Sequence, residues 1–192
     1  MINNKDELKR ILKIEKNIYL QLGYKNNILS KILNSEIAYI YSYIRLLRYD
    51  EYYENCKKSI FSKVIHGFIR RKRNKLGLIL GLNIPINTCD IGLTIYHSNG
   101  IIINSNAKIG KYCKFHGDNC IGNDGIHNDE LPVLGDNVDI GIGAKIIGKT
   151  IIEDNVIIGA NAVVLKGIYE KNVTIAGMPA KIIKRSTTNG KG

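Results

Sequence analysis

The stretch from Ile91 to Val164 advances in steps of six residues, and this period constrains the fold more than any other feature of the chain. A helix repeats every 3.6 residues and a strand every two, so a period of six fits neither element alone. It predicts a short strand followed by a tight turn, stacked repeatedly into the coils of a β-helix. The repeating aliphatic and aromatic positions are Ile103, Ile109, Phe115, Ile121, Leu134, Ile140, Ile146, Ile152, Ile158 and Val164.

Other columns of the repeat agree with this interpretation. The residue after each repeating position is often Gly, and the fourth residue after it is usually small or β-branched. Between these lie residues that tolerate a positive φ angle, as a tight turn requires: Asn106, Asn137, Gly143, Asn155 and Asn161. Three such steps close one turn of about 18 residues, so each position is expected beneath the residue 18 later.

The repeat is interrupted between Ile121 and Leu134, where the interval is one residue longer than two steps of six. The segment from Gly122 to Val133 is rich in Asn, Asp and Gly and contains a Pro. Such a composition inside a stack of coils predicts one loop extruded from the coil. Loops on rigid scaffolds often carry function, although a tolerated insertion without a role remains the alternative.

The chain before the coils has the pattern of amphipathic helices. An apolar stripe begins near Leu8 among Lys and Glu residues, with Asn4 as the expected N-cap and Glu7 three residues later. Further helices are predicted over residues 28–47 and 51–75. The chain is therefore predicted to be an α+β protein with an α-helical N-terminal domain over 1–81, a β-helix domain over 82–183 and a flexible tail over 184–192.

The composition sets the compartment and the partners that we expect. No apolar run approaches the ~18 residues of a membrane span, and no signal peptide is recognised. The four cysteines are not spaced as metal pairs and are interpreted as reduced packing residues, which predicts a cytoplasmic protein.

The net charge of +11 is concentrated in the N-terminal domain, where the residues up to Gly81 include 17 Lys and Arg but only 7 Asp and Glu. It peaks at Arg70-Arg71-Lys72-Arg73-Asn74-Lys75. A solvated helix end is the plainest interpretation. Peripheral contact with an anionic membrane or a phosphate-bearing acceptor is the alternative. Nucleic acid is not expected as a partner, because no recognition motif accompanies the run.

Histidine is the residue type that most directly suggests chemistry in the coils. His97 lies in Tyr96-His97-Ser98-Asn99-Gly100 and is expected beneath Phe115, beside the column of His116. A neutral imidazole has a lone pair that accepts a proton from an alcohol or amine. With His127 on the extruded loop, this grouping favours a functional over a structural role. No metal site is predicted, because no His/Cys ligand spacing accompanies these residues.

The repeats, with the segment from His97 to Ile103 and the ending Ala176-Gly177-Met178-Pro179-Ala180-Lys181, resemble the hexapeptide-repeat acyltransferases. The serine acetyltransferases and their relatives in surface-polysaccharide biosynthesis are the most similar branch. The resemblance implies a left-handed parallel β-helix, a homotrimer, and acetyl-CoA bound in the groove between coils. It covers about Asn83 to Lys184 and says little about the acceptor.

The resemblance also implies roles for single residues. His97 matches the general base that deprotonates the acceptor hydroxyl, and His116 is a second catalytic candidate. Tyr96, Asp118 and His127 are the candidates for acceptor binding. The positions that match the family's acetyl-CoA groove are Gly141, Ile142, Gly143, Ala160, Asn161, Ala176, Gly177 and Lys181.

Two departures from the serine acetyltransferases bear on the acceptor. Those enzymes have an Asp immediately before the base, where this chain has Tyr96, and a His before the loop Pro, where it has Leu131. The sequence therefore favours an acetyl-CoA-dependent O-acetyltransferase acting on a saccharide hydroxyl of a surface polysaccharide, on a nucleotide- or lipid-linked acceptor. Serine O-acetylation is the first alternative, and a non-catalytic trimeric scaffold is the second.

Overall fold

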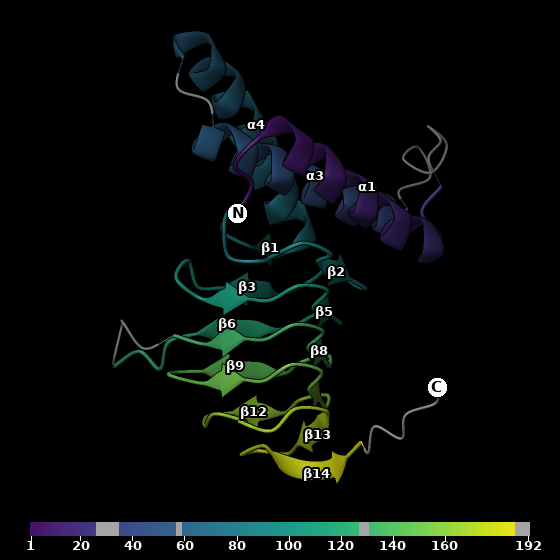
Figure 1. The fold of residues 1–192 in the computed structure, drawn as a ribbon, viewed down its shortest axis with the longest axis vertical. Helices are drawn as coiled ribbons and strands as arrows, with labels where there is room; N and C mark the ends of the chain where they lie inside the picture. The colour runs from purple at the N-terminus through teal and green to yellow at the C-terminus, as the bar shows by residue number, and fades with distance from the viewer. Residues whose placement is uncertain (26–34, 57–58, 127–130, 187–192) are drawn as a thin grey trace.

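A computed structural model describes residues 1–25, 35–56, 59–126 and 131–186. In this part of the chain, helices α1 (Lys5–Gln21), α3 (Glu36–Cys56) and α4 (Ile60–Leu80) form a head above a stack of short strands (Figure 1). The strands are β1 (Leu82–Asn83), β2 (Thr94–Ile95), β3 (Ile101–Ile103), β4 (Lys108–Ile109), β5 (Lys114–Phe115), β6 (Cys120–Gly122), β7 (Val133–Leu134), β8 (Asp139–Ile140), β9 (Lys145–Ile147), β10 (Ile151–Ile152), β11 (Ile157–Ile158), β12 (Val163–Val164), β13 (Val173–Ala176) and β14 (Lys181–Arg185).

Helix α1 begins where the sequence predicts. The side chain of Asn4 accepts a hydrogen bond from the backbone N–H of Glu7 at 2.8 Å, which satisfies one of the free donors of the first turn. Beyond the helix, Gly23 adopts a φ of +93°, which a residue with a side chain rarely adopts. The predicted cap is confirmed.

The two predicted helices over residues 28–47 and 51–75 are wrong in their boundaries. Helix α3 continues unbroken to Cys56, because Arg48, Asp50 and Glu51 are buried partners in ion pairs and not part of a polar turn. Helix α4 runs past residue 75 to Leu80, where Gly81 in the left-handed conformation ends it. The predicted flexible tail over 184–192 is wrong at its start, because Lys184 and Arg185 belong to strand β14. Residues 28–34 and 187–192 lie outside the described residues.

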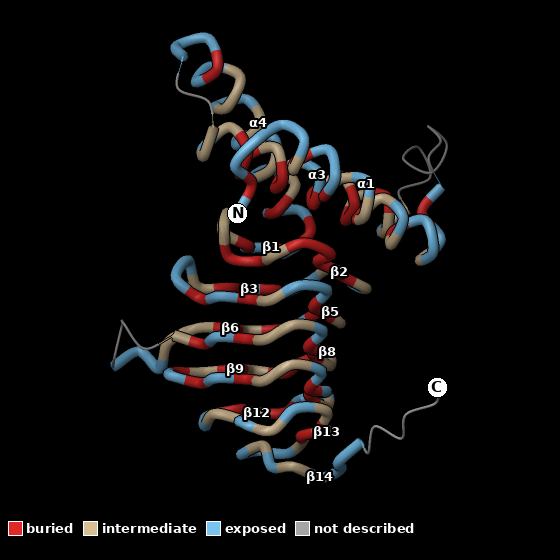
Figure 2. Tube along the Cα trace, in the orientation of Figure 1, coloured by how far each residue is buried: buried red, intermediate tan, exposed pale blue. Residues whose placement is uncertain are grey.

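The strands form the three faces of a prism, as the period of six predicts. One sheet has the order β1-β3-β6-β9-β12, the second β10-β7-β4, and the third β14-β13-β11-β8-β5-β2. Every pairing is parallel except that of β13 with the last strand, β14. The repeating aliphatic residues point inward and are buried along the whole stack (Figure 2).

The register between coils locates the extruded loop. Between the coil after the loop and the next one the partners are 18 residues apart, as in the bond from the N–H of Asp136 to Asp154. Across the loop the separation is 25, as in the bond from Lys111 to Asp136. The step from Ile121 to Leu134 is thus one face with seven surplus residues, and the sequence interpretation of a single surplus residue is wrong.

The turns use residues that tolerate a positive φ, with one exception to the prediction. Asn137, Gly143, Asn155 and Asn161 have φ between +56° and +74°, but Asn106 is not among the residues with a positive φ. The other four lie at corners where the chain must turn sharply within a six-residue step.

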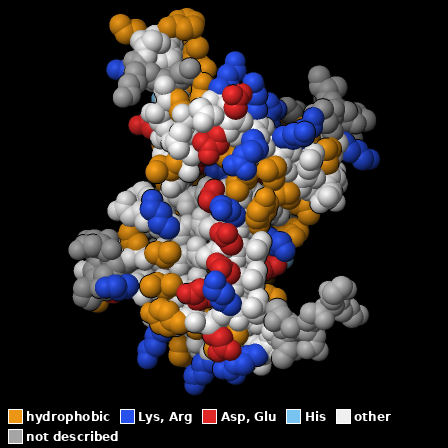
Figure 3. All heavy atoms as spheres, viewed as in Figure 1, with side chains coloured by type: hydrophobic (Ala, Val, Ile, Leu, Met, Phe, Trp, Pro, Cys, Tyr) orange, Lys and Arg blue, Asp and Glu red, His pale blue; other side chains and the backbone are white. Residues whose placement is uncertain are grey.

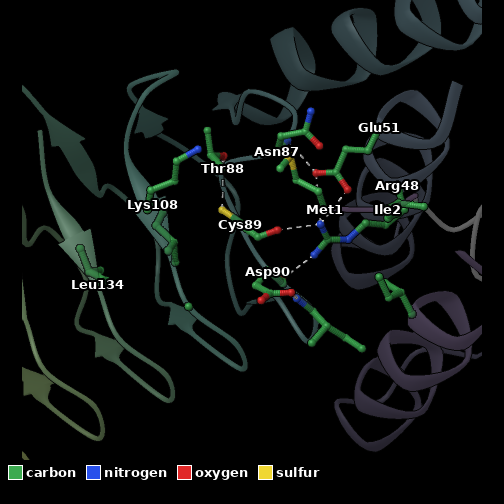
Figure 4. Close-up of a pocket in the computed structure, with 14 residues that line it drawn as sticks. Met1, Ile2, Arg48, Glu51, Asn87, Thr88, Cys89, Asp90, Lys108 and Leu134 are labelled. Carbon is green, nitrogen blue, oxygen red and sulfur yellow. Dashed lines mark hydrogen bonds and ion pairs between the residues drawn. The ribbon is translucent and has the colours of Figure 1, made fainter. Parts of the chain in front are cut away.

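Arg48 fixes the head on the first coil. Its guanidinium is 2% exposed and donates to Glu15 at 2.7 Å and to Glu51 at 2.9 Å. It also donates to the backbone carbonyls of Cys89 and Asp90, at 2.8 and 2.7 Å. Figure 4 shows Arg48 with Glu51, Cys89 and Asp90 at the wall of a cavity of about 330 Å³ between the head and the upper coils. Because every charge of this cluster is buried and paired, the head and the prism are tightly coupled.

All four cysteines are free. Burial raises the pKa of the Cys89 thiol to about 12, and that of Cys113 likewise to about 12. These two thiols are protonated packing residues rather than nucleophiles. In the described part of the chain, none of the helices has the length and apolarity needed to span a bilayer.

Candidate active site

His97 lies in a corner of the prism that is two residues longer than the corner beneath it. The register pairs Thr94 with Lys114, 20 residues later, but Ile102 with Cys120, only 18 later. The surplus falls in the segment between β2 and β3, where Asn99 and Gly100 have φ of +80° and +71°. The extra length carries the imidazole out of the prism, and its side chain is 66% exposed.

The predicted stacking of His97 beneath Phe115 is therefore wrong. Ile95 takes that position, and His97 lies against Gly117, because a Cβ built on Gly117 would be 3.4 Å from the carbonyl oxygen of His97. The coil that contains His97 is 20 and not 18 residues long at this corner, because of the two surplus residues. Gly117 therefore faces His97 in the neighbouring coil, and His116 is the residue before Gly117.

Glu36, in the first turn of α3, holds the corner that carries His97. One oxygen of its carboxylate lies 3.4 Å from Nδ1 of His97. The other accepts hydrogen bonds from the N–H and the hydroxyl of Ser98, both at 2.8 Å. Partial burial acts to raise the pKa of the Glu36 carboxyl, but the bonds from Ser98 and His97 outweigh it and lower the pKa overall.

A second histidine–carboxylate pair lies one coil below. Nε2 of His116 is 2.8 Å from the carboxylate of Asp139, and the ring of Tyr96 stacks on the His116 ring at 4.5 Å. The structure therefore brings together three residues predicted for the site, Tyr96, His97 and His116. It adds two that the sequence interpretation missed, Glu36 and Asp139.

The remaining predicted acceptor residues are placed differently. Asp118 forms an ion pair with Lys145 at 3.0 Å and has a φ of +50° at the corner below Asn99. Its carboxylate is thus already neutralised by a lysine. His127 lies outside the described residues.

The predicted groove residues do lie together, along one edge of the stack. Gly141, Gly159 and Ala176 follow His116 in the same column, and a Cβ on Gly141 would be 2.7 Å from Ile158 O and Ala160 N. Asn161 donates its N–H to the carbonyl of Ile142 at 2.8 Å, and Val163 donates to Gly177 at 3.0 Å. The exposed residues along this edge are Ile142, Ala160, Asn161 and Gly177. This edge is a strip of small residues that leaves room for a thin chain to approach the backbone.

The lower end of this strip is basic. Lys181 is exposed at the start of β14, and Lys184 lies further along the same strand. Arg185 is occupied, because it forms an ion pair with Glu170 at 2.7 Å. Within the described residues, no three His, Cys, Asp or Glu side chains gather as a metal site would require.

Part of the coils matches a known family of repeats. A family model described as bacterial transferase hexapeptide (six repeats) matches residues 132–166, the coils from β7 to beyond β12. These coils are thus similar to the repeat of that transferase family. Their short parallel strands and positive-φ corners are the structural form of that repeat.

Relatives of known name are similar to about half of this chain. A serine acetyltransferase of Synechococcus elongatus is 36% identical over 96 residues, which is 50% of this chain and 39% of that protein. A serine acetyltransferase of Mycobacterium tuberculosis is 33% identical over 105 residues, 53% of this chain and 45% of that one. The chain spans less than half the length of these relatives.

Solved structures share the fold of this chain. A serine acetyltransferase from Brucella abortus superposes with a TM-score of 0.70 over 95% of this chain and 71% of its own, at 22% identity. A structure described as serine acetyltransferase in complex with CoA gives a TM-score of 0.58 over 76% and 57%, also at 22% identity. At this identity the likeness shows architecture. The predicted α+β class, with a helical head followed by a left-handed parallel β-helix, is confirmed.

Proposed function

We propose that this chain is an acetyl-CoA-dependent O-acetyltransferase in which His97 is the general base. The observation that carries the proposal is an exposed imidazole held by a carboxylate, with Nδ1 of His97 3.4 Å from Glu36. When Nδ1–H faces the carboxylate, the lone pair on Nε2 is free to accept a proton. The relatives named serine acetyltransferases support the same class of reaction.

In this mechanism the acceptor hydroxyl gives its proton to Nε2 of His97 as its oxygen attacks the thioester carbonyl. The tetrahedral intermediate collapses, the C–S bond breaks, and the imidazolium returns the proton to the departing thiolate of CoA. Glu36 favours the charged imidazolium that exists between the two transfers. Ser98 fixes the Glu36 carboxylate through two hydrogen bonds, so the base is held before the acceptor arrives.

The strip of small residues is the proposed site of the pantetheine chain of acetyl-CoA. Pantetheine is thin, and its amides pair with exposed backbone groups, which Ala160, Asn161 and Gly177 leave accessible. Lys181 at the basic end is the proposed contact for the nucleotide phosphates. The strip ends at His116 and Tyr96, so the thioester end would lie near the proposed base. No metal enters this mechanism.

A homotrimer is part of the proposal, because the CoA groove of the resembling enzymes lies between neighbouring coils of a trimer. The strip and the His97 corner are on the outside of the prism, where a second protomer can complete them. The cytoplasmic location is also a proposal, supported by the free thiols and by the use of acetyl-CoA.

Two acceptors remain, and each is favoured by a specific observation. The names of the similar proteins favour serine more than a saccharide. Tyr96 and Leu131, in place of the Asp and His of that branch, favour an acceptor without the charges of a free amino acid. The stacked rings of Tyr96 and His116 offer a flat apolar surface suited to a sugar face.

An acceptor screen that measures free CoA decides between them. Incubation with acetyl-CoA and either L-serine or a panel of nucleotide- and lipid-linked saccharides is followed by thiol titration. Turnover with serine alone assigns serine O-acetylation, and turnover with a saccharide alone assigns saccharide O-acetylation. The scaffold alternative requires that acetyl-CoA does not bind, and isothermal titration with acetyl-CoA tests it separately.

A further inference from the structure

Helix α4 presents one face that no described part of the chain covers. Ile60, Phe61, Val64 and Phe68 are 83%, 76%, 55% and 64% exposed. The first half of the helix projects beyond α1 and α3 (Figure 1), and hydrophobic side chains gather over this projecting end (Figure 3). An apolar face of this kind on a helix end is unusual for a surface that stays in water.

The orientation of this face is fixed from the opposite side of α4. His66 and Arg73 point toward α3, where both contact the buried carboxylate of Asp50. Gly77 and Leu80 are also buried on that side. Since the helix is anchored through these residues, it cannot rotate its apolar side chains into the core.

The same outer face is strongly basic. Phe61, Val64 and Phe68 are followed by Arg71 and Lys75 in steps of three and four residues, which places them along one side of a helix. Lys72 is exposed beside them, and these three cations have no ion pair with a described residue. Helix α4 contains no Asp or Glu from Ile60 to Leu80.

We propose that this face of α4 docks on the surface of an anionic lipid bilayer. Phenylalanine and valine side chains enter the boundary between head groups and acyl chains, while Arg71, Lys72 and Lys75 bind the lipid phosphates. A face with apolar anchors alone would also suit a second copy of the chain. The absence of acids from α4, with three free cations, makes an anionic surface the better complement. This inference does not depend on the acetyl-transfer proposal.

Co-sedimentation of the full chain with vesicles tests the proposal. We expect binding to vesicles that contain phosphatidylserine, little binding to pure phosphatidylcholine, and weakening as salt is added. The triple variant Arg71→Gln, Lys72→Gln, Lys75→Gln should bind on the order of 100-fold more weakly, because each cation near an anionic surface strengthens binding several-fold. Gln keeps the helix propensity, so the fold is retained.

A matched control removes the same charge from the other side of the head. Lys5→Gln, Arg10→Gln, Lys13→Gln changes three exposed cations of α1 and should bind within about tenfold of the unchanged protein, since α1 does not form the proposed face. Equal loss in both triple variants would contradict docking through α4, as would failure of the unchanged protein to bind.

The double variant Phe61→Gln, Phe68→Gln separates a lipid surface from a second copy of the chain. The proposal predicts weaker vesicle binding with an unchanged molecular mass by light scattering. A fall in molecular mass would show that the face is an interface between copies and would overturn the proposal.

Discussion

The carboxylate of Glu36 lies 3.4 Å from Nδ1 of His97, although 61 residues separate them in the sequence. One residue belongs to the first turn of a helix in the head and the other to a corner of the first coil. The contact therefore makes the head part of the proposed active site. It also gives the head a role beyond covering the open end of the prism.

Replacing this carboxylate should slow the reaction without weakening the binding of acetyl-CoA. We expect Glu36→Gln to lower kcat on the order of 10²-fold, because a base displaced by about 1 Å loses that much. Acetyl-CoA affinity, measured by isothermal titration, should not change, since the groove residues lie in other coils. Glu54→Gln, which removes a carboxylate paired with Arg70, is the control. Equal kcat in Glu36→Gln and the unchanged protein would contradict the positioning role.

The same carboxylate should make stability depend on pH in one direction. The folded-state pKa of Glu36 is below its ordinary value of 4.5, so its contribution is complete above that value and is lost as the pH falls through the folded pKa. The difference in Tm between the unchanged protein and Glu36→Gln should be largest near neutral pH and vanish in strong acid. A difference that grew as the pH fell would contradict the hydrogen bonds assigned to Glu36.

Arg48 should be among the least replaceable residues of the head. Arg48→Ala leaves two buried carboxylates, Glu15 and Glu51, without their partner, which costs about 3–5 kcal/mol. Chemical denaturation gives the free energy of unfolding for this variant. Arg45→Ala on the same helix is the control, because Arg45 is exposed and its loss should cost about 0.5 kcal/mol or less. Similar losses in both variants would show that the cluster does not hold the head.

Filling the strip of small residues should block acetyl-CoA. We expect Ala160→Tyr to raise the Kd for acetyl-CoA by a factor of ten or more, measured by isothermal titration, because the side chain occupies the proposed path of pantetheine. Tm should hardly change, since Ala160 is exposed. Lys166→Tyr, at an exposed position away from the strip, is the control. An unchanged Kd for acetyl-CoA in Ala160→Tyr would show that acetyl-CoA does not bind along this strip.

The period of six was sufficient to predict the β-helix because each coil repeats one local pattern, from Ile103 to Val164. Local signals also found the start of α1, since an N-cap such as Asn4 acts within its own turn. The break predicted between residues 47 and 51 is wrong, because α3 runs through it. Arg48, Asp50 and Glu51 are buried by contacts with other parts of the chain, which no local pattern reveals.

The candidate site was predicted only in part for the same reason. His97, His116 and the strip from Gly141 to Gly177 lie in the coils, where sequence spacing reports spatial position. Glu36 had no such signal, because the head meets the prism through a contact between segments far apart in the sequence. Asp139 would have been found from the 25-residue register across the loop, had the seven surplus residues been assigned to a single face.

Single-turnover release of CoA by the unchanged protein and by His97→Asn, with the acceptor identified in the screen, tests the central claim most directly. The account predicts that the variant binds acetyl-CoA equally well but transfers the acetyl group about 10² to 10⁴ times more slowly, the range for a lost general base. Because the side chain of His97 is exposed, the Tm of the His97→Asn variant should equal that of the unchanged protein. Equal rates of CoA release in the two proteins would contradict the assignment of His97 as the base.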